Sequence, residues 1–233
     1  MRPPRARGAR LPEGTRALIF DMDGTMVDSM PSHAWSWETF ARARGVALET
    51  VDLMRMVNGR TAWEGMRALL GADLPAETLD RFVAEKEGMY REHFARAFSE
   101  VPGFRAFEAA ARAAGLATGI GTAGDRHNLA FVLERLALPP LRAMVGGDEG
   151  LPGKPDPAIF LEAARRLGVP PAQCVVFEDA PFGIEAARRA GMRAVAICTT
   201  HPPHELSGPH VLAAVPDYES LLQSNFLGTP HDA

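Results

Sequence analysis

Two aspartates, Asp21 and Asp23, follow the short apolar run Ala17-Leu18-Ile19-Phe20 and precede Gly24-Thr25. Side chains alternate along an extended segment, so both carboxylates can point the same way. Two carboxylates at one site raise each other's pKa unless a cation lies between them, and hard oxygen ligands of this kind suit Mg²⁺. The alternative interpretation is a turn in which aspartate and glycine only end a strand. This motif alone leaves both interpretations open.

A second acidic pair, Glu178 and Asp179, follows another apolar run, Cys174-Val175-Val176-Phe177. Two strands that each end in carboxylates, within one parallel sheet, would together form a metal site at the sheet edge. A helix N-cap explains one of these acids, because Pro181 opens a helical pattern, but it leaves the other acid without a role. The two pairs together therefore indicate a divalent-metal site.

Thr122 and Lys154 are two further candidates. Thr122 ends an apolar run within Gly119-Ile120-Gly121-Thr122-Ala123-Gly124, where small residues would let a phosphate approach backbone N–H groups and the hydroxyl would add a donor. Lys154 lies in a rigid loop, residues 150–157, before a helical pattern. Only Lys86 and Lys154 among the 25 basic residues are lysines, so a lysine in this loop indicates that a compact positive charge is needed. Chance placement is the alternative.

The elements that must position these side chains alternate between strand and helix. Continuously apolar runs predict buried parallel strands at Ala17–Phe20, Ala117–Thr122, Ala143–Gly147, Cys174–Phe177 and Ala194–Cys198. Helical patterns that stop at glycine or proline separate the later strands, at Phe104–Ala114, Asn128–Leu138, Pro157–Leu167 and Phe182–Ala190. The predicted fold class is therefore α/β, with a doubly wound parallel sheet whose ligands lie outside the carboxyl ends of the strands.

The interval 30–100 interrupts this alternation, because it holds only helical patterns, at Ser32–Arg44, Thr50–Val57, Ala62–Leu70 and Ala76–Phe98. It must be an insertion, since the first strand still needs its parallel neighbours. We expect a discontinuous catalytic core formed by residues 15–29 and 101–225. A small helical cap, residues 30–100, is expected over the end of the first strand. Residues 1–14 are expected to be a disordered leader and residues 226–233 a tail.

Taken in order, Asp21-x-Asp23-Gly24-Thr25, Thr122, Lys154 and Glu178-Asp179 resemble the four motifs of the haloacid dehalogenase superfamily of phosphotransferases. The phrases Gly153–Pro157 and Gly183–Gly191 strengthen the resemblance, which covers roughly residues 17–200. The helical insertion is similar to that of the subgroup containing β-phosphoglucomutase and small phosphatases. A dehalogenase proper would lack the second aspartate of the first motif, so this residue favours phosphate chemistry.

The resemblance implies a Rossmann-like core and a role for each motif. Asp21 is expected to be the nucleophile that forms an aspartyl-phosphate, and Asp23 the general acid and base. Thr122 and Lys154 are expected to bind the oxygens of the transferred phosphoryl group. The cofactor Mg²⁺ is expected to be held by Asp21, Asp23 (through its backbone carbonyl), Asp179 and Glu178.

Substrate choice is expected to depend on the cap and on the segment after Thr122. The candidate substrate-binding residues are His33, Trp37, Asn58, Gly59, Arg60, Thr61, Ala123 and Arg126. Arg60 could bind a second phosphate or a carboxylate through its planar fork, with a solvated surface arginine as the alternative. His33 could instead be a packed helix residue. Trp35 and Trp37 cannot share a helix face, so one is expected to pack inside the cap and the other to face the cleft.

Several groups that grip a second phosphate in the mutase of this subgroup are missing here. The chain has Asn58 and Ala62 where β-phosphoglucomutase has a lysine and an arginine, and Gly124-Asp125 where it has a serine and a lysine. Arg60 and Arg126 could compensate. The sequence therefore predicts a Mg²⁺-dependent phosphatase that acts on a small phosphorylated metabolite such as a sugar phosphate. A sugar-phosphate mutase is the alternative, and a non-catalytic binder of phosphorylated ligands is a minor one.

The composition argues against other classes of partner. A formal net charge of −4 gives no electrostatic reason to expect nucleic acid or an anionic membrane as partner. No apolar run approaches the roughly 20 residues that span a bilayer, and the basic, proline-rich start lacks the apolar centre of a signal peptide. Cys174 and Cys198 are expected to be buried free thiols. We expect a cytoplasmic monomer.

Overall fold

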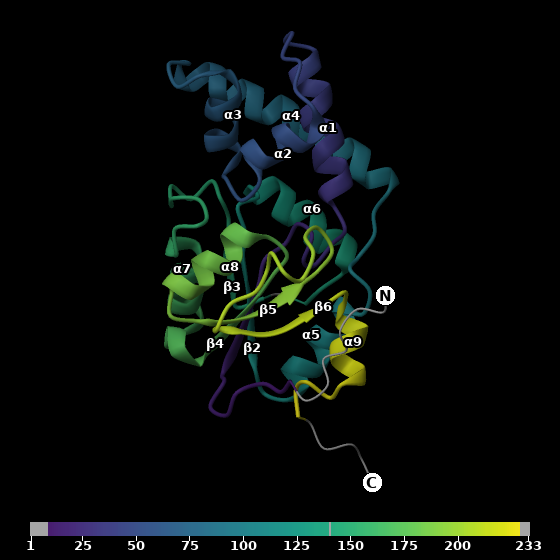
Figure 1. Ribbon diagram of the computed structural model, residues 1–233, viewed down its shortest axis with the longest axis vertical. Helices are drawn as coiled ribbons and strands as arrows, with labels where there is room; N and C mark the ends of the chain where they lie inside the picture. Colours follow the sequence, from purple (N-terminus) through teal and green to yellow (C-terminus); the bar gives the residue numbers. More distant parts are fainter. Residues whose placement is uncertain (1–8, 140, 229–233) are drawn as a thin grey trace.

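The computed structural model describes residues 9–139 and 141–228, and its centre is a six-stranded parallel sheet in the order β3-β2-β1-β4-β5-β6 (Figure 1). The two central strands, β1 and β4, are buried at every residue, which explains why their sequences are apolar without alternation. The strands are β1 (Ala17–Phe20), β2 (Ala117–Gly121), β3 (Ala143–Val145), β4 (Cys174–Glu178), β5 (Arg193–Ile197) and β6 (Val211–Val215). The predicted α/β fold class is confirmed.

Helices cover both faces of the sheet. Successive residues of β1 divide between the two faces, because side chains alternate along a strand: Leu18 and Phe20 belong to one apolar core, and Ala17 and Ile19 to the other. The first core also contains α5 (Phe104–Ala113), α6 (Arg126–Leu136) and α9 (Tyr218–Gln223). The second contains α7 (Ala158–Leu167) and α8 (Pro181–Arg189). The sheet is thus doubly wound.

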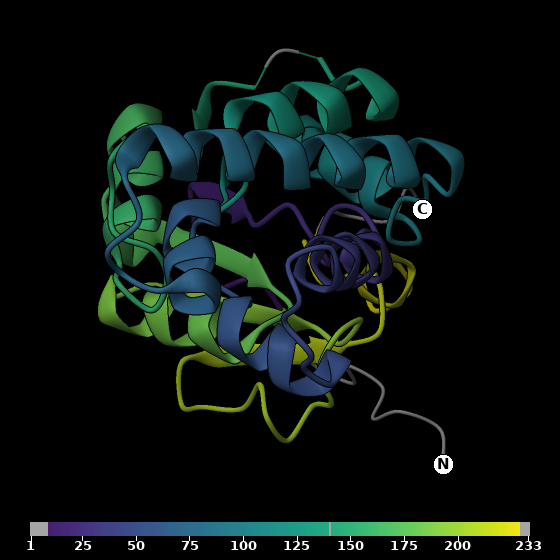
Figure 2. The ribbon, with the colours of Figure 1, turned by 90° about the horizontal axis from the view of Figure 1, so that it is seen from above.

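Four helices between β1 and α5 form what we call the helical unit: α1 (Met30–Arg42), α2 (Thr50–Val57), α3 (Ala62–Leu70) and α4 (Ala76–Arg96). They lie at one end of the molecule, above the sheet, and share an apolar core of their own around Trp37, Phe40 and Met66 (Figure 1). Seen from above, the long helix α4 runs alongside α6 (Figure 2). Tyr90 and Phe94 of α4 also pack into the core beside the sheet.

The chain enters and leaves the helical unit at the same place. Val27 and Glu100 form an antiparallel bridge, flanked by hydrogen bonds from Val101 N to the Met26 carbonyl at 3.0 Å and from Asp28 N to the Ser99 carbonyl at 2.9 Å. The two connections therefore support each other. This arrangement keeps the helical unit directly over the segment that follows β1.

Two elements near the end of the chain were not predicted, β6 and α9. The strand β6 is half-exposed at four of its five residues because it lies at the sheet edge, although its sequence, Val-Leu-Ala-Ala-Val, is as continuously apolar as that of a central strand. Of the predicted terminal segments, residues 1–8 and 229–233 lie outside the described residues. In the described part, Leu11 N donates to the Phe226 carbonyl at 2.9 Å and Phe226 is fully buried. Leu11 and Phe226 thus pack onto the α/β core.

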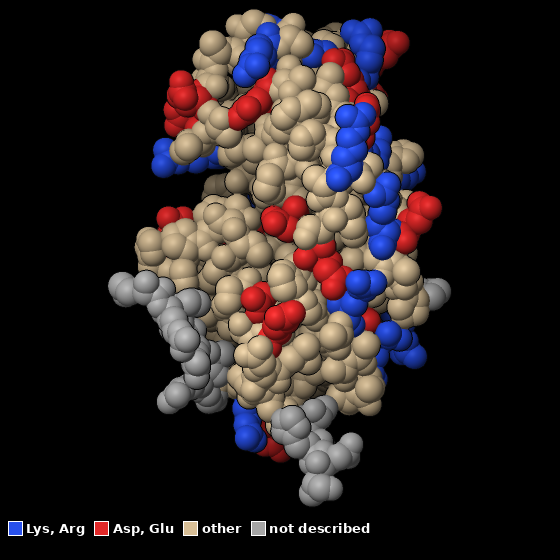
Figure 3. All heavy atoms as spheres, turned by 90° about the vertical axis from the view of Figure 1, so that its right-hand side faces the viewer, with Lys and Arg blue, Asp and Glu red and all other residues tan. Residues whose placement is uncertain are grey.

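Charges are mixed on the surface. On the face drawn in Figure 3, basic and acidic side chains are interspersed, and a hollow separates the helical unit from the α/β part below it. Among the described residues, none of the helices has the length and apolar character needed to cross a membrane. Cys174 is buried, Cys198 is half-buried, and both are free thiols.

Candidate active site

The ends of β1 and β4 bring three carboxylates together. The two strands are parallel neighbours with Phe20 beside Phe177, and the Asp21 N–H donates to the Phe177 carbonyl at 3.0 Å. The side chains at and beyond these ends are Asp21 on one strand and Glu178 and Asp179 on the other. All three are buried, and each offers a carboxylate oxygen within 4.8 Å of the other two.

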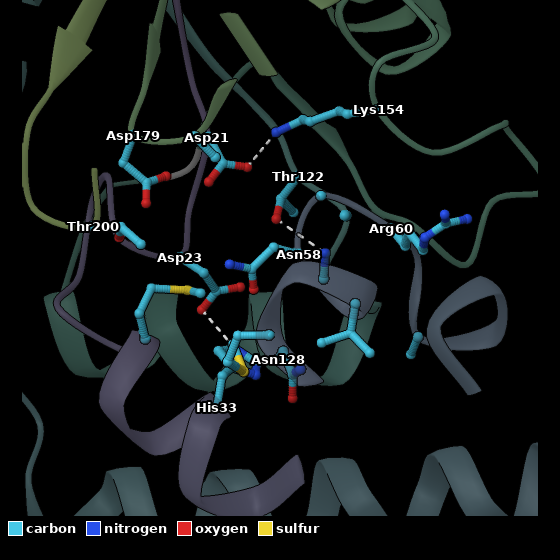
Figure 4. Close-up of a pocket in the computed structure, with 18 of the residues that line it drawn as sticks. Asp21, Asp23, His33, Asn58, Arg60, Thr122, Asn128, Lys154, Asp179 and Thr200 are labelled. Atoms are coloured by element: carbon cyan, nitrogen blue, oxygen red, sulfur yellow. Dashed lines mark hydrogen bonds and ion pairs between the residues drawn. The ribbon is translucent and has the colours of Figure 1, made fainter. Parts of the chain in front are cut away.

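Lys154 lies in the same buried cluster and points at Asp21 (Figure 4). Its Nζ donates to Asp21 Oδ1 at 2.6 Å and to Glu178 Oε1 at 2.7 Å, and only 4% of the residue is exposed. Burial alone would lower the pKa of Lys154, but the two carboxylates raise it above its ordinary value. The amine therefore stays positively charged beside Asp21.

One lysine does not balance three carboxylates. Burial raises the pKa of Asp21 to about 7; Lys154 opposes this shift and Glu178 adds to it. Burial, followed by the charges of Glu178 and Asp21, also raises the pKa of Asp179. Carboxylates that resist ionisation in this way are stabilised by a divalent cation. A set of buried carboxylate oxygens is the donor chemistry that Mg²⁺ prefers, so these residues fit that ion.

Gly24 allows the first motif to approach Asp179 closely. Its φ is +77°, and a Cβ at this position would overlap the Asp179 carboxylate. The next residue, Thr25, donates from Oγ1 to Asp179 Oδ1 at 3.2 Å. The sequence Asp-x-Asp-Gly-Thr thus folds back against the second acidic pair.

Asp23 is separated from this cluster, because its carboxylate is held by other partners. Ser29 Oγ donates to Asp23 Oδ1 at 2.6 Å and Tyr90 OH donates to it at 3.1 Å, while His33 Nε2 lies 3.1 Å from the same oxygen. Burial would raise the pKa of Asp23, but His33 and the two hydroxyls lower it to about 2. The two aspartates of the first motif therefore have opposite protonation behaviour.

The end of β2 supplies a third wall. Thr122, Ala123 and Gly124 line the pocket, and Thr122 is 1% exposed. The Thr122 hydroxyl accepts the Gly124 N–H at 3.0 Å, which fixes the turn after the strand. The parallel pairing of β2 with β1 brings this turn to the sheet edge where Asp21 lies.

The helical unit closes the pocket from the opposite side. Trp37, Asn58, Gly59, Lys86 and Glu87 all line it. Gly59 has a φ of +77°, and a Cβ there would lie 2.9 Å from the ring of Phe182 at the start of α8. The turn after α2 therefore sits directly against the α/β core.

Besides the contacts of Tyr90 and His33 with Asp23, two further sets of hydrogen bonds join the helical unit to the α/β core around the pocket. At one, Glu64 Oε1 accepts the Gly153 N–H at 3.2 Å, next to Lys154 in the chain. At the other, Asn128 of α6 donates from Nδ2 to Glu87 Oε2 at 2.7 Å and accepts from Arg91 Nη1 at 2.8 Å. The pocket is thus lined by both parts of the molecule.

The geometry and the comparisons with known proteins agree on a family. Residues 15–191 match the family described as haloacid dehalogenase-like hydrolase. The chain belongs to the haloacid dehalogenase-like hydrolases. This hydrolase is similar to fructose-1-phosphate phosphatase YqaB of Escherichia coli K12, with 36% identity over 182 residues, 76% of this chain and 94% of that protein.

The hydrolase is also similar to β-phosphoglucomutase of Bacillus subtilis, with 30% identity over 195 residues, 80% of this chain and 85% of that protein. Among solved structures, a hydrolase from Pseudomonas syringae aligns with a TM-score of 0.80 at 26% identity and covers 90% of this chain and 97% of that one. The hydrolase is therefore an enzyme that acts on phosphate esters.

Most residues singled out from the sequence of the hydrolase meet in this pocket. The predicted residues that line it are Asp21, Asp23, His33, Trp37, Asn58, Gly59, Arg60, Thr122, Ala123, Lys154, Glu178 and Asp179. Thr61 and Arg126 do not line it. Thr61 caps α3 and exchanges hydrogen bonds with Glu64, and Arg126 is exposed and paired with Asp148 at 2.5 Å.

The structure favours the surface alternative for Arg60 and differs from the expectation for the two tryptophans. The Arg60 side chain points away from the carboxylate cluster, and its Nε donates to the Met56 carbonyl at 2.9 Å (Figure 4). Trp37 both packs in the core of the helical unit and lines the pocket, whereas Trp35 is 41% exposed and stacks on His93. The tryptophans were expected to divide these two roles. One large ring instead fulfils both, because the pocket borders that core.

Four polar residues that line the pocket were not singled out from the sequence: Lys86, Glu87, Asn128 and Thr200. Lys86 carries the same signal as Lys154, since both are lysines in an arginine-rich chain. Glu87 and Asn128 carry no comparable signal, because charged and amide residues are common on helices. Thr200 follows β5 and was beyond the predicted motifs.

Proposed function

We propose that this hydrolase is a Mg²⁺-dependent phosphatase that hydrolyses the monophosphate ester of a small sugar or polyol. The observation that carries the proposal is the opposite environment of the two aspartates. Asp21 lies beside Lys154 in a cluster with more carboxylates than cations, whereas Asp23 faces the helical unit and is hydrogen-bonded by Ser29 and Tyr90. The nucleophile must contact phosphorus and the acid–base group must contact the leaving oxygen, so the two carboxylates need separate positions and separate partners.

Asp21, Asp179 and Glu178 would hold Mg²⁺, with the Asp23 backbone carbonyl as a further expected ligand. When bound, the ion supplies positive charge that offsets the charge of the phosphate and of the nucleophile. Glu178 already has both oxygens occupied, one by Lys154 Nζ at 2.7 Å and one by Ala180 N at 2.7 Å. We therefore infer that Asp21 and Asp179 are the direct carboxylate ligands and that Glu178 mainly orients Lys154.

In the first half of the reaction, a carboxylate oxygen of Asp21 attacks phosphorus and the bond from phosphorus to the ester oxygen breaks. Lys154 and the turn after Thr122 would hold the phosphoryl oxygens. Asp23 would give a proton to the departing oxygen, which leaves as an alcohol. The pKa of Asp23 is about 2 without substrate, so a bound phosphate dianion must raise it, as a nearby like charge does.

In the second half, a water molecule attacks phosphorus of the aspartyl-phosphate. Asp23 takes a proton from that water, the bond from phosphorus to the Asp21 oxygen breaks, and inorganic phosphate leaves. We infer that the helical unit acts as a cap, residues 30–100, over a core of residues 15–29 and 101–225. It would exclude other water while the sugar is bound and let one water enter afterwards.

A mutase is the second candidate, because the chain is also similar to a β-phosphoglucomutase. A mutase must hold a bisphosphate intermediate by both ends. The two arginines that could take the second phosphate, Arg60 and Arg126, are directed at the Met56 carbonyl and at Asp148. Because neither arginine is directed into the pocket to bind a second phosphate, the site supports a phosphatase over a mutase.

The test is a panel of sugar and polyol monophosphates with Mg²⁺, followed by release of inorganic phosphate and by NMR of the sugar product. We expect phosphate release at a rate that saturates with at least one member, and loss of turnover in Asp21→Asn. Asp52→Asn, at an exposed position of α2, is the matched control and should keep full activity. If NMR shows an isomerised sugar phosphate and no phosphate is released, the enzyme is a mutase and the proposed phosphatase function is refuted. Full activity of Asp21→Asn would refute the nucleophile.

A further inference from the structure

The part of the pocket away from the carboxylate cluster contains a buried ion pair on α4. Lys86 Nζ donates to Glu87 Oε1 at 2.9 Å, and the two residues are 1% and 4% exposed. Adjacent residues of a helix point about 100° apart, so it is unusual that both reach one cavity. Here Lys86 Nζ lies over the face of the Trp37 ring, 4.7 Å from its centre, and donates to Glu87 at the pocket wall.

Glu87 is held in place by the α/β core as well. Its second oxygen accepts Asn128 Nδ2 at 2.7 Å, and Arg91 supports the same amide through Asn128 Oδ1 at 2.8 Å. Burial would raise the pKa of Glu87, but Lys86, His33 and Asn128 lower it, so the carboxylate is ionised. A fixed negative charge therefore faces the pocket beside the positive charge of Lys86.

The formal charges of Lys86 and Glu87 cancel at this end of the pocket. The neighbouring wall is made of uncharged side chains, among them Trp37, Met54, Val57 and Asn58. Arg60 is at the rim and binds the Met56 carbonyl. Among the described residues that line the pocket, no cation at this end is free of a carboxylate or carbonyl partner. A second phosphate would bring two negative charges next to Glu87, where the positive charge of Lys86 is already neutralised.

We propose that Glu87 is a specificity-determining residue, which neutralises Lys86 so that the site accepts an uncharged, hydroxyl-bearing leaving group and rejects one that carries a second phosphate. The proposal rests on the proposed phosphatase function and concerns the same pocket. The hydroxyl groups of a polyol can donate to Glu87 and accept from Lys86 and Asn58, so the pair remains useful to a neutral substrate. The same pair penalises an anionic one.

The experiment compares fructose 1-phosphate with fructose 1,6-bisphosphate, two probes that differ by one phosphate. The quantity measured is the ratio of kcat/KM for the bisphosphate to kcat/KM for the monophosphate, from initial rates of phosphate release. Glu87→Gln leaves Lys86 with an unbalanced charge, and the ratio should rise about tenfold. Both constants come from one preparation, so any loss of folded or active enzyme cancels from the ratio.

A set of charge variants makes the result specific. Lys86→Gln leaves Glu87 unbalanced and should lower the ratio, and the double variant Lys86→Gln/Glu87→Gln should return it to about the wild-type value. Glu92→Gln, at an exposed position of the same helix, is the matched control and should not change it. An unchanged ratio in Glu87→Gln, or a rise in Lys86→Gln, would overturn the proposal.

Failure of the proposed phosphatase function and failure of the proposed role of Glu87 give different results. If the wild type hydrolyses none of the sugar phosphates, the proposed function fails. The charge argument is then tested by competition, as the ratio of inhibition constants of the two fructose phosphates against hydrolysis of an aryl phosphate. The variants should shift this ratio in the same order, with tighter bisphosphate binding in Glu87→Gln. The same ratio of inhibition constants in the wild type and in the three charge variants would refute the role of Glu87 by itself.

Discussion

Replacing Gly153 by alanine tests whether the helical unit positions the loop that carries Lys154. Gly153 is buried and its φ lies outside the left-handed region, so alanine suits the backbone. The new Cβ, however, would overlap Glu64 Oε2 and lie 3.2 Å from Thr61 N. Glu64 cannot move aside without loss, because Oε2 accepts Thr61 N at 2.8 Å and Thr61 Oγ1 at 3.0 Å, and Oε1 accepts Gly153 N at 3.2 Å.

The size of the effect follows from the contact that the methyl group must break. A hydrogen bond to a charged acceptor contributes about 1.5–3 kcal/mol net. If the closed arrangement is the reactive one, its loss lowers kcat/KM by about 10- to 150-fold, since each 1.36 kcal/mol is a factor of ten. Part of the α3 capping box is lost as well, which should cost about 1 kcal/mol of stability.

The assay is kcat/KM for phosphate release in a double-mutant cycle with Glu64→Ala. That second change removes both the acceptor and the atom with which the methyl group collides. Glu64→Ala alone should show a similar loss, and Gly153→Ala added to it should cost less than about threefold more. The reasoning is refuted if Gly153→Ala keeps wild-type kcat/KM, or if its cost is the same with and without the Glu64 side chain.

Three further outcomes are expected. Gly183→Ala should lower kcat by at least about tenfold, because its Cβ would overlap the Glu178 carboxylate that holds Lys154. Its control is Gly88→Ala in α4, where a Cβ meets open space; this variant should keep activity and gain about 0.5–1 kcal/mol of stability. Full activity of Gly183→Ala in the phosphate-release assay would contradict the site geometry. Mg²⁺ at about 100 times its Kd should stabilise the chain by about 2.7 kcal/mol, or about 5–10 °C in Tm by calorimetry, and Asp179→Asn should remove most of this shift. No shift in the wild type would exclude a cation site. Glu87 has a pKa lowered from 4.5 in the folded chain, so the folded state binds fewer protons and the contribution of Glu87 to stability is present above pH 4.5 and lost as the pH falls. The difference in free energy of unfolding between wild type and Glu87→Gln, from urea titrations, should therefore shrink on acidification; a difference independent of pH would show that the charge of Glu87 does not stabilise the fold.

The carboxylate cluster could be predicted from the sequence because parallel pairing fixes its geometry. Because β1 and β4 are parallel neighbours, their carboxyl ends bring together Asp21, Glu178 and Asp179 at one sheet edge. The same argument places Thr122 at the end of β2. Continuous apolar runs indicate buried parallel strands, so the shared sheet edge followed from the pattern, whereas the order of the strands came from the structure.

The half formed by the helical unit could not be predicted in the same way. A helical pattern gives the length of α4 but not its rotation relative to α6, and that rotation decides that Glu87 meets Asn128. The direction of Arg60 is decided by a single hydrogen bond to the Met56 carbonyl. The edge strand β6 was missed for a different reason, since its five residues are continuously apolar and the run itself was a usable signal.

Both lysines of the chain, Lys86 and Lys154, have their amines inside the pocket. Acylating reagents such as activated esters attack lysine only where the amine can be reached, so both lysines should react slowly while the pocket is closed. The rate at which the two lysine peptides gain mass, followed by mass spectrometry, would then report how often the pocket opens. Because the chain has so few lysines, acylation of the unmodified protein would measure the opening of the pocket without an engineered label.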